Sequence, residues 1–153
     1  MEEKTTTFFR FEDLRIYAKA VGYAQWVLEM MGNPTEEARK HLFRAFSRSA
    51  YDISLNVAEG SSRNKSQFEH YLKNAKTAIR ECVVYTTIGA NMGFLTPEQE
   101  EYSRTVLMEL TRMVGALIIS LQRSMQARSE EVEENESDFD TVDTSFRTDF
   151  PEI

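Results

Sequence analysis

Four long segments of this chain repeat apolar residues at alternating three- and four-residue steps, and residues that start or stop helices bound each segment. This spacing places the apolar side chains on one face of an α-helix. The segments cover roughly residues 11–31, 35–59, 67–92 and 97–127. Short links join them, and short links between long helices make neighbouring helices pack antiparallel. The sequence therefore predicts an all-α fold, an up-down-up-down four-helix bundle.

Capping signals support the boundaries of these segments. Ser66 and Glu69 have the spacing of a capping box, in which each side chain satisfies a free backbone N–H group of the other residue. Thr96 and Gln99 repeat that spacing around a proline preset for the first helical turn. Glycine follows each of the first three segments, where it can end a helix at little cost. These glycines are Gly32, Gly60 and Gly93.

The first and fourth segments carry more apolar residues than a single stripe needs. In the first segment the expected stripe is Leu14, Tyr17, Val21, Ala24, Leu28 and Met31, with Ile16, Trp26 and Val27 outside it. In the fourth it is Val106, Leu110, Met113, Leu117 and Leu121, widened by Leu107, Val114 and Ile118. Surplus apolar surface of this kind marks interaction sites. We therefore expect the chain to associate with copies of itself.

The charge of the chain is unevenly distributed. Residues 129–153 hold ten acidic side chains and one arginine, a net charge of −9, whereas residues 1–128 sum to +2. A run so acidic and so poor in apolar residues favours disorder, because it cannot offset the entropy of ordering. We therefore expect a flexible N-terminus over 1–10, a bundle over 11–128 and a disordered acidic tail over 129–153. Phe139, Val142, Phe146 and Phe150 lie among the acids, and a short docking motif is the alternative interpretation of that segment.

Several kinds of chemistry find no support in the sequence. One cysteine, Cys82, excludes an internal disulfide framework and lies on an expected apolar stripe, where it is typical of a small buried hydrophobe. His41 and His70 form no metal-ligand spacing, and no glycine-rich phosphate loop occurs. The first residues carry no secretory signal, and no apolar run reaches the length of a membrane span. We therefore expect a cytoplasmic, non-enzymatic protein without a cofactor, a bound metal, a membrane or a small-molecule substrate.

The most distinctive stretch is Asp52–Arg63, which joins the second and third segments. Asn56 and Glu59 are three residues apart and share a helix face. Gly60 lets the chain leave the helix, and the planar guanidinium of Arg63 can meet a carboxylate just beyond the turn. These residues predict a corner locked by hydrogen bonds, with a ligand or partner site as the alternative. Glu81, in the middle of the third segment, is expected to pair with Arg44 or Arg48.

This arrangement resembles the four-helix-bundle proteins encoded in intervening sequences of bacterial 23S rRNA genes. The resemblance covers about residues 8–122, and its most specific part is Asn56-Val57-Ala58-Glu59-Gly60 followed by Arg63. The opening of the first segment, from Asp13 to Ala20, supports it. The chain departs from the family pattern at Asp52, where serine is usual, and at Thr77-Ala78, where a Gly-Ser pair is frequent.

The resemblance implies a small bundle that assembles as a homopentamer and has no established biochemical activity. A related branch is the accessory protein of diversity-generating retroelements, which is strongly basic and works with a reverse transcriptase and nucleic acid. Two rows of basic side chains in this sequence are candidates for phosphate contacts, as the nucleic-acid-binding branch would require. They are Lys40, Arg44 and Arg48 in the second segment and Lys73, Lys76 and Arg80 in the third. A solvated face with local ion pairs is the alternative interpretation of both rows.

Overall fold

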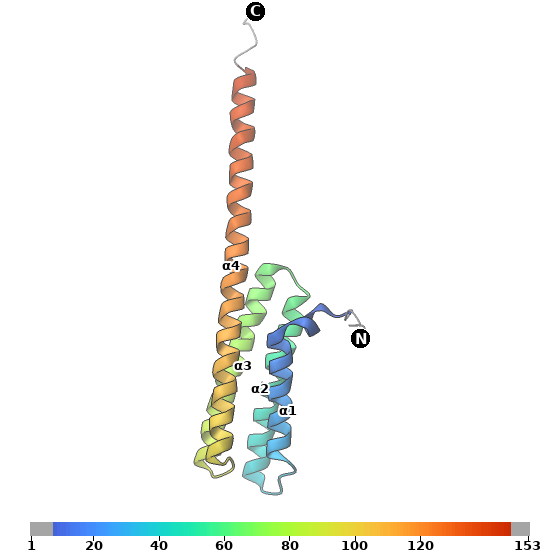
Figure 1. Cartoon of the computed structure of the whole chain (residues 1–153), viewed down its shortest axis with the longest axis vertical. Coiled ribbons are helices and arrows are strands. Elements are labelled where there is room, and N and C mark those ends of the chain that lie inside the picture. Colours follow the sequence, from blue (N-terminus) through green and yellow to red (C-terminus); the bar gives the residue numbers. More distant parts are fainter. Residues whose placement is uncertain (1–7, 148–153) are drawn as a thin grey trace, which may run out of the picture.

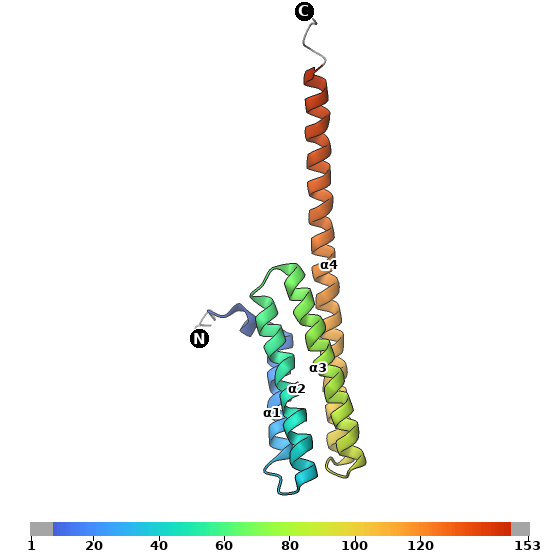
Figure 2. The same ribbon diagram turned by 180° about the vertical axis from the view of Figure 1, so that it is seen from behind.

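The structure is a computed structural model that describes residues 8–147, with side chains described as far as residue 137. Residues 8–147 contain a short 3-10 helix, η1 (Arg10–Asp13), then α1 (Arg15–Met31), α2 (Glu37–Ser61), α3 (Lys65–Asn91) and α4 (Pro97–Arg147), and no strand. Figure 1 and Figure 2 show the four long helices side by side with alternating direction. The predicted up-down-up-down four-helix bundle is confirmed.

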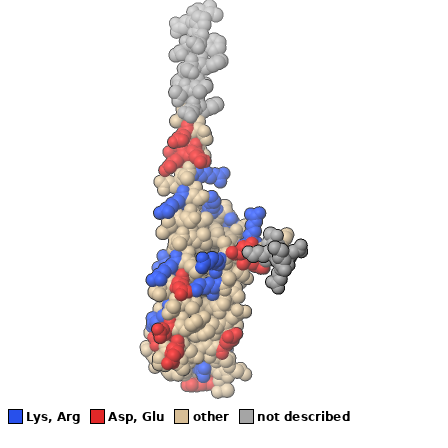
Figure 3. All heavy atoms as spheres, viewed as in Figure 1, with Lys and Arg blue, Asp and Glu red and all other residues tan. Residues whose placement is uncertain are grey.

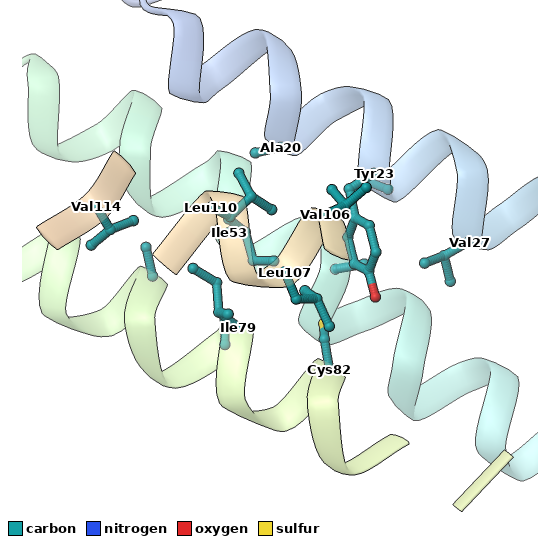
Figure 4. Packing of buried hydrophobic residues seen from close by; sticks show 14 of the residues in the cluster. Ala20, Tyr23, Val27, Ile53, Ile79, Cys82, Val106, Leu107, Leu110 and Val114 are labelled. Carbon is teal, nitrogen blue, oxygen red and sulfur yellow. The ribbon is translucent and has the colours of Figure 1, made fainter. Parts of the chain in front are cut away.

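Side chains from all four helices fill one apolar core (Figure 4). Phe46 and Ile53 of α2, Leu72 of α3 and Leu110 and Val114 of α4 are fully buried. Phe46 and Ile53 stand seven residues apart and Leu110 and Val114 four, so each pair lies on one face of its helix. The described part of α4 is also apolar enough to pass a length-and-composition test for a membrane span, a test that core helices of soluble proteins also pass.

The predicted apolar stripe of α1 is confirmed at Ala24 and Met31, whereas Val21 and Leu28 each stand one residue beyond a buried position. Its buried residues are Ile16, Ala20, Tyr23, Ala24, Val27 and Met31. Leu28 is 37% exposed, whereas Val27 is fully buried. The sequence of α1 carries two overlapping apolar rows, and packing against the neighbouring helices decides which one faces inward. The surplus assigned to Ile16 and Val27 is therefore core, and so is the surplus assigned to Leu107, Val114 and Ile118 of α4.

The caps are confirmed at one helix and wrong at another. At the start of α4 the backbone N–H of Thr96 donates to Gln99 Oε1 at 2.9 Å, and the N–H of Gln99 donates to Thr96 Oγ1 at 3.1 Å. At the start of α3 the cap is Asn64 rather than Ser66, and its Oδ1 accepts from the N–H of Gln67 at 2.9 Å. Asparagine competes effectively for this position, so α3 begins two residues earlier than its serine suggests.

The C-terminal part of α4 differs from the predicted disordered tail. The helix does not end near Arg128 but continues through Arg147, and Figure 1 shows it projecting far beyond the other three helices. Glutamate is a good helix former. The preceding turns of α4 are already helical within the bundle, so the helix can extend without the unfavourable step of nucleation. Phe150 of the expected docking motif, like most of the expected flexible N-terminus, lies outside the described residues.

A buried chain of hydroxyl groups links α1, α3 and α4 within the apolar core. Thr86 Oγ1 donates to the carbonyl oxygen of Cys82 at 2.7 Å, so its oxygen accepts from Ser103 Oγ at 2.8 Å. The oxygen of Ser103 then accepts from the Tyr23 hydroxyl at 2.8 Å. Burial raises the pKa of Tyr23 far above its usual range, which keeps the phenol protonated as a donor. Each of the three hydroxyl groups therefore donates its proton to one fixed acceptor.

We predict that Ser103→Ala lowers the free energy of unfolding by about 1–3 kcal/mol, because it leaves the buried Tyr23 hydroxyl without an acceptor. In a Tyr23→Phe background the same change should cost less, since no orphaned phenol remains. Urea unfolding of the wild type, both single variants and the double variant measures this coupling. Strictly additive effects of the two substitutions would contradict the hydroxyl chain.

Candidate functional site

The corner between α2 and α3 is held by close packing around Gly60. A Cβ at this position would lie 2.7 Å from Tyr71 Cβ and 2.9 Å from Phe68 Cδ1, both on α3. Gly60 is buried and lies inside α2, which ends at Ser61. The expectation that Gly60 releases the chain from the helix is therefore wrong. The position requires glycine because α3 crosses too near for any side chain.

The expected pairing of Glu59 with Arg63 is present at this corner. Glu59 Oε1 accepts from Arg63 Nη2 at 2.6 Å and from Arg63 Nε at 3.1 Å. The Arg63 guanidinium also lies 5.8 Å from the centre of the Tyr71 ring. Both partners of the ion pair are about half-exposed, so the pair adds little to stability and mainly orients the guanidinium.

Asn56 and Glu81 do not join that corner cluster. Asn56 Nδ2 donates to the backbone carbonyl of Asp52 at 2.8 Å, one turn earlier in α2. Glu81 accepts from the buried hydroxyl of Ser49 at 2.7 Å, about three turns from the corner. The expectation that Glu81 pairs with an arginine is wrong, because the short hydroxyl of α2 occupies the position facing it.

A shallow cavity of about 540 Å³ opens beside this Ser49–Glu81 hydrogen bond, between α2 and α3. Charged and aromatic side chains line it: His41, Arg44, Arg48 and Asp52 from α2, and Glu81 and Tyr85 from α3. Two arginines face two carboxylates, so the lining carries little net charge at neutral pH. Among residues 8–137, no group of three or more His, Cys, Asp or Glu side chains could hold a metal ion. The cavity is therefore a mixed-charge surface suited to polar contacts.

Each basic row contains one lysine that forms an ion pair within its own helix. Lys40 pairs with Glu37 at 3.5 Å, and Lys73 pairs with Glu69 at 3.3 Å. Arg44, Arg48, Lys76 and Arg80 form no ion pair with any side chain that the structure describes. Figure 3 shows basic and acidic side chains interspersed over one face of the bundle, with acids gathered on the projecting part of α4. Four of the six expected phosphate-contacting side chains are thus available to a partner.

Cys82 is a core residue, as its stripe predicted. Its side chain is fully buried, and it lies among core residues in Figure 4. Burial, reinforced by the nearby carboxylates of Glu81 and Asp52, raises the pKa of the Cys82 thiol well above its usual range. A thiol held protonated and shielded from water is a poor nucleophile.

Sequence reasoning did not identify which large apolar side chains of α3 and α4 remain exposed. Val84 and Ile88 of α3 are 54% and 44% exposed, and Met108 of α4 is 48% exposed. Arg104 Nη2 donates to Thr87 Oγ1 at 2.8 Å, which places Thr87 and Arg104 at the same level of the two antiparallel helices. Ile119 continues the exposed apolar row along α4. Most of the surplus apolar residues predicted from the sequence are core residues, and only the packing of the bundle shows which apolar residues remain exposed.

A family model described as the 23S rRNA-intervening sequence protein matches residues 12–116, more than half of the chain. This range includes the corner motif, both basic rows and most of the exposed apolar surface on α3 and α4. It ends before the projecting part of α4. No curated protein matches the chain.

We predict that Gly60→Ala lowers the free energy of unfolding by about 1–3 kcal/mol, because the new methyl group overlaps Tyr71 and Phe68. Gly22→Ala is the matched control: a Cβ there has no atom within 4 Å, and alanine favours a helix by up to about 1 kcal/mol. Urea unfolding at one protein concentration measures both variants. A Gly60→Ala protein as stable as the control would contradict the close crossing.

Proposed function

The chain belongs to the family of 23S rRNA-intervening sequence proteins, and from this premise we propose that it is a non-enzymatic, self-associating bundle that acts as a scaffold for a macromolecular partner. The family is one of small helical proteins of unknown function and is not a known enzyme family. Its resemblance to bundles that form closed rings makes a homopentamer the expected assembly.

One observation carries this proposal: α3 and α4 leave the large apolar side chains of Val84, Ile88, Met108 and Ile119 exposed. Each of these side chains is about half-exposed. Large apolar side chains grouped on two adjacent helices are the kind of surface that protein partners cover. A second copy packed on this surface would remove it from water.

We predict that Ile88→Glu and Met108→Glu each shift the assembly towards monomer, because a buried glutamate in an apolar contact is costly. Native mass spectrometry and light scattering at micromolar concentration measure the mass. Gln25→Glu, which adds the same charge to an exposed position of α1, should leave the mass unchanged. A wild-type monomer, or folded variants that keep the full assembly, would rule out self-association through this surface.

A second candidate function is nucleic-acid binding as an accessory protein of a reverse transcriptase. The observation that favours it is a set of four basic side chains that form no ion pair among residues 8–137: Arg44, Arg48, Lys76 and Arg80. Ring symmetry would repeat them and make weak phosphate contacts multivalent. The carboxylates of Asp52 and Glu81 beside the two arginines oppose this role, and so does the acidic end of the chain.

For this second candidate we predict that deleting residues 129–153 tightens binding to RNA or DNA, because it removes a net charge of −9. Binding should weaken steeply between about 50 and 200 mM salt, as counterion release requires. Fluorescence anisotropy with labelled single- and double-stranded probes measures both effects. Arg44→Gln/Arg48→Gln in the truncated chain should weaken binding and flatten the salt dependence. A truncated chain that binds neither probe at low salt would discard this candidate.

A further inference from the structure

The projecting part of α4 has a regular apolar seam that the bundle does not use. The last contacts with α3 are those of Gln122, whose Nε2 donates to Glu69 Oε1 at 2.7 Å, and of Ser124, which accepts from Lys65. Beyond them the helix runs on through Arg147; Met125 is half-buried, and the side chains of residues 126–137 are exposed. Along the sequence, apolar residues recur every seven positions from the bundle core outward: Ile118, Met125, Val132, Phe139 and Phe146.

A seven-residue apolar repeat is typical of a helix that packs against another helix along its length. Leu121 and Val142 stand four residues before Met125 and Phe146, at the second apolar position of the repeat, and Arg128 and Asn135 occupy that position between them. Val132 is 50% exposed. A shallow groove of about 480 Å³ follows the seam and is lined by Met125, Arg128, Ser129, Val132 and Glu133. The seam thus has both the sequence pattern and the surface of a helix-docking site.

The charges beside the seam define which helix can dock there. Glu131 and Glu136 stand at the two positions that flank the apolar seam, and Asp138 and Asp143 repeat those positions in the next heptad. In a coiled coil these flanking positions face those of the partner helix. A second copy of this chain, parallel or antiparallel, would therefore set acid against acid. Nucleic acid and anionic membranes would be repelled by the same carboxylates.

We propose that the projecting part of α4 is a docking site for a basic amphipathic helix of another protein, with apolar residues in heptads and Lys or Arg at the flanking positions. This inference gives a chemical class to the partner of the proposed scaffold. Its support lies in residues 125–147, outside the region that the family model matches. Ring symmetry would present several such docking helices at one end of the assembly.

The test uses the full-length chain and a synthetic helical peptide of four heptads, with Leu and Ile at the seam and Lys at the flanking positions. A second peptide has the same composition in scrambled order. Fluorescence anisotropy at about 150 mM salt, where surface charges are already strongly screened, measures binding. The heptad peptide should bind the full-length chain and the scrambled peptide should bind much more weakly. No binding of the heptad peptide, or equal binding of both peptides, would overturn the proposal.

Two variants of the chain separate seam contacts from charge. Val132→Ser should weaken peptide binding about tenfold, because the valine is buried in the complex. Ser137→Ala, on the opposite side of the helix, is the matched control and should leave binding unchanged. Glu131→Gln/Glu136→Gln should weaken binding and reduce its salt dependence. Circular dichroism checks that each variant keeps its helix, and unchanged affinity of a helical Val132→Ser variant would refute docking at the seam.

Native mass spectrometry of the chain truncated after Arg128 distinguishes this inference from the proposed self-association. The truncated chain should keep the mass of the wild-type assembly but lose peptide binding. A drop to monomer on truncation would show that the projecting helix binds another copy of the chain, and would overturn the proposal. A wild-type monomer that binds the heptad peptide would reject the ring and leave the docking site standing.

Discussion

The bundle depends on the close packing of α2 against α3, which glycine permits at both ends of their shared interface. At one end, Gly60 lets Phe68 and Tyr71 lie where a side chain would otherwise stand. At the other end, a Cβ on Gly89 would collide with Leu95 and press against Leu42. Between these two points the helices run antiparallel, with Ser49 bonded to Glu81 and Phe46 lying near Tyr85. α1 and α4 then close the core over this pair.

That packing also shapes the mixed-charge cavity. With the helix axes drawn together, the short Ser49 side chain reaches Glu81 directly, and longer side chains are pushed to the rim. Arg44 and Arg48 therefore point to solvent instead of meeting the carboxylate between the helices. Because Glu81 accepts from a neutral hydroxyl, it neutralises neither arginine, whereas a salt bridge would have neutralised one of them.

The sequence predicted the helices better than their faces. The apolar period, the glycines near the segment ends and the Thr96–Gln99 cap located all four helices, because these signals act within a few residues. The inward face of α1 was not predictable, since Val27 and Leu28 are equally apolar and only the neighbouring helices decide between them. At the site, the Glu59–Arg63 pair was predicted because its partners are one turn apart. The Ser49–Glu81 bond was not, because it depends on how two helices register.

The two halves of α4 follow different physical rules. The half within the bundle is held by burial of Leu107, Leu110 and Val114, and its charges are spaced among apolar residues. The projecting half has no such burial, yet composition alone misjudged it, because acidity was taken as evidence against order. Glutamate opposes collapse but favours a helix that a bundle has already nucleated. Strong negative charge would oppose the pairing of two such helices, while the apolar seam offers a surface to a partner. A segment of this kind is ordered enough to present a seam and too charged to cover it with itself, so its complement is a helix of opposite charge.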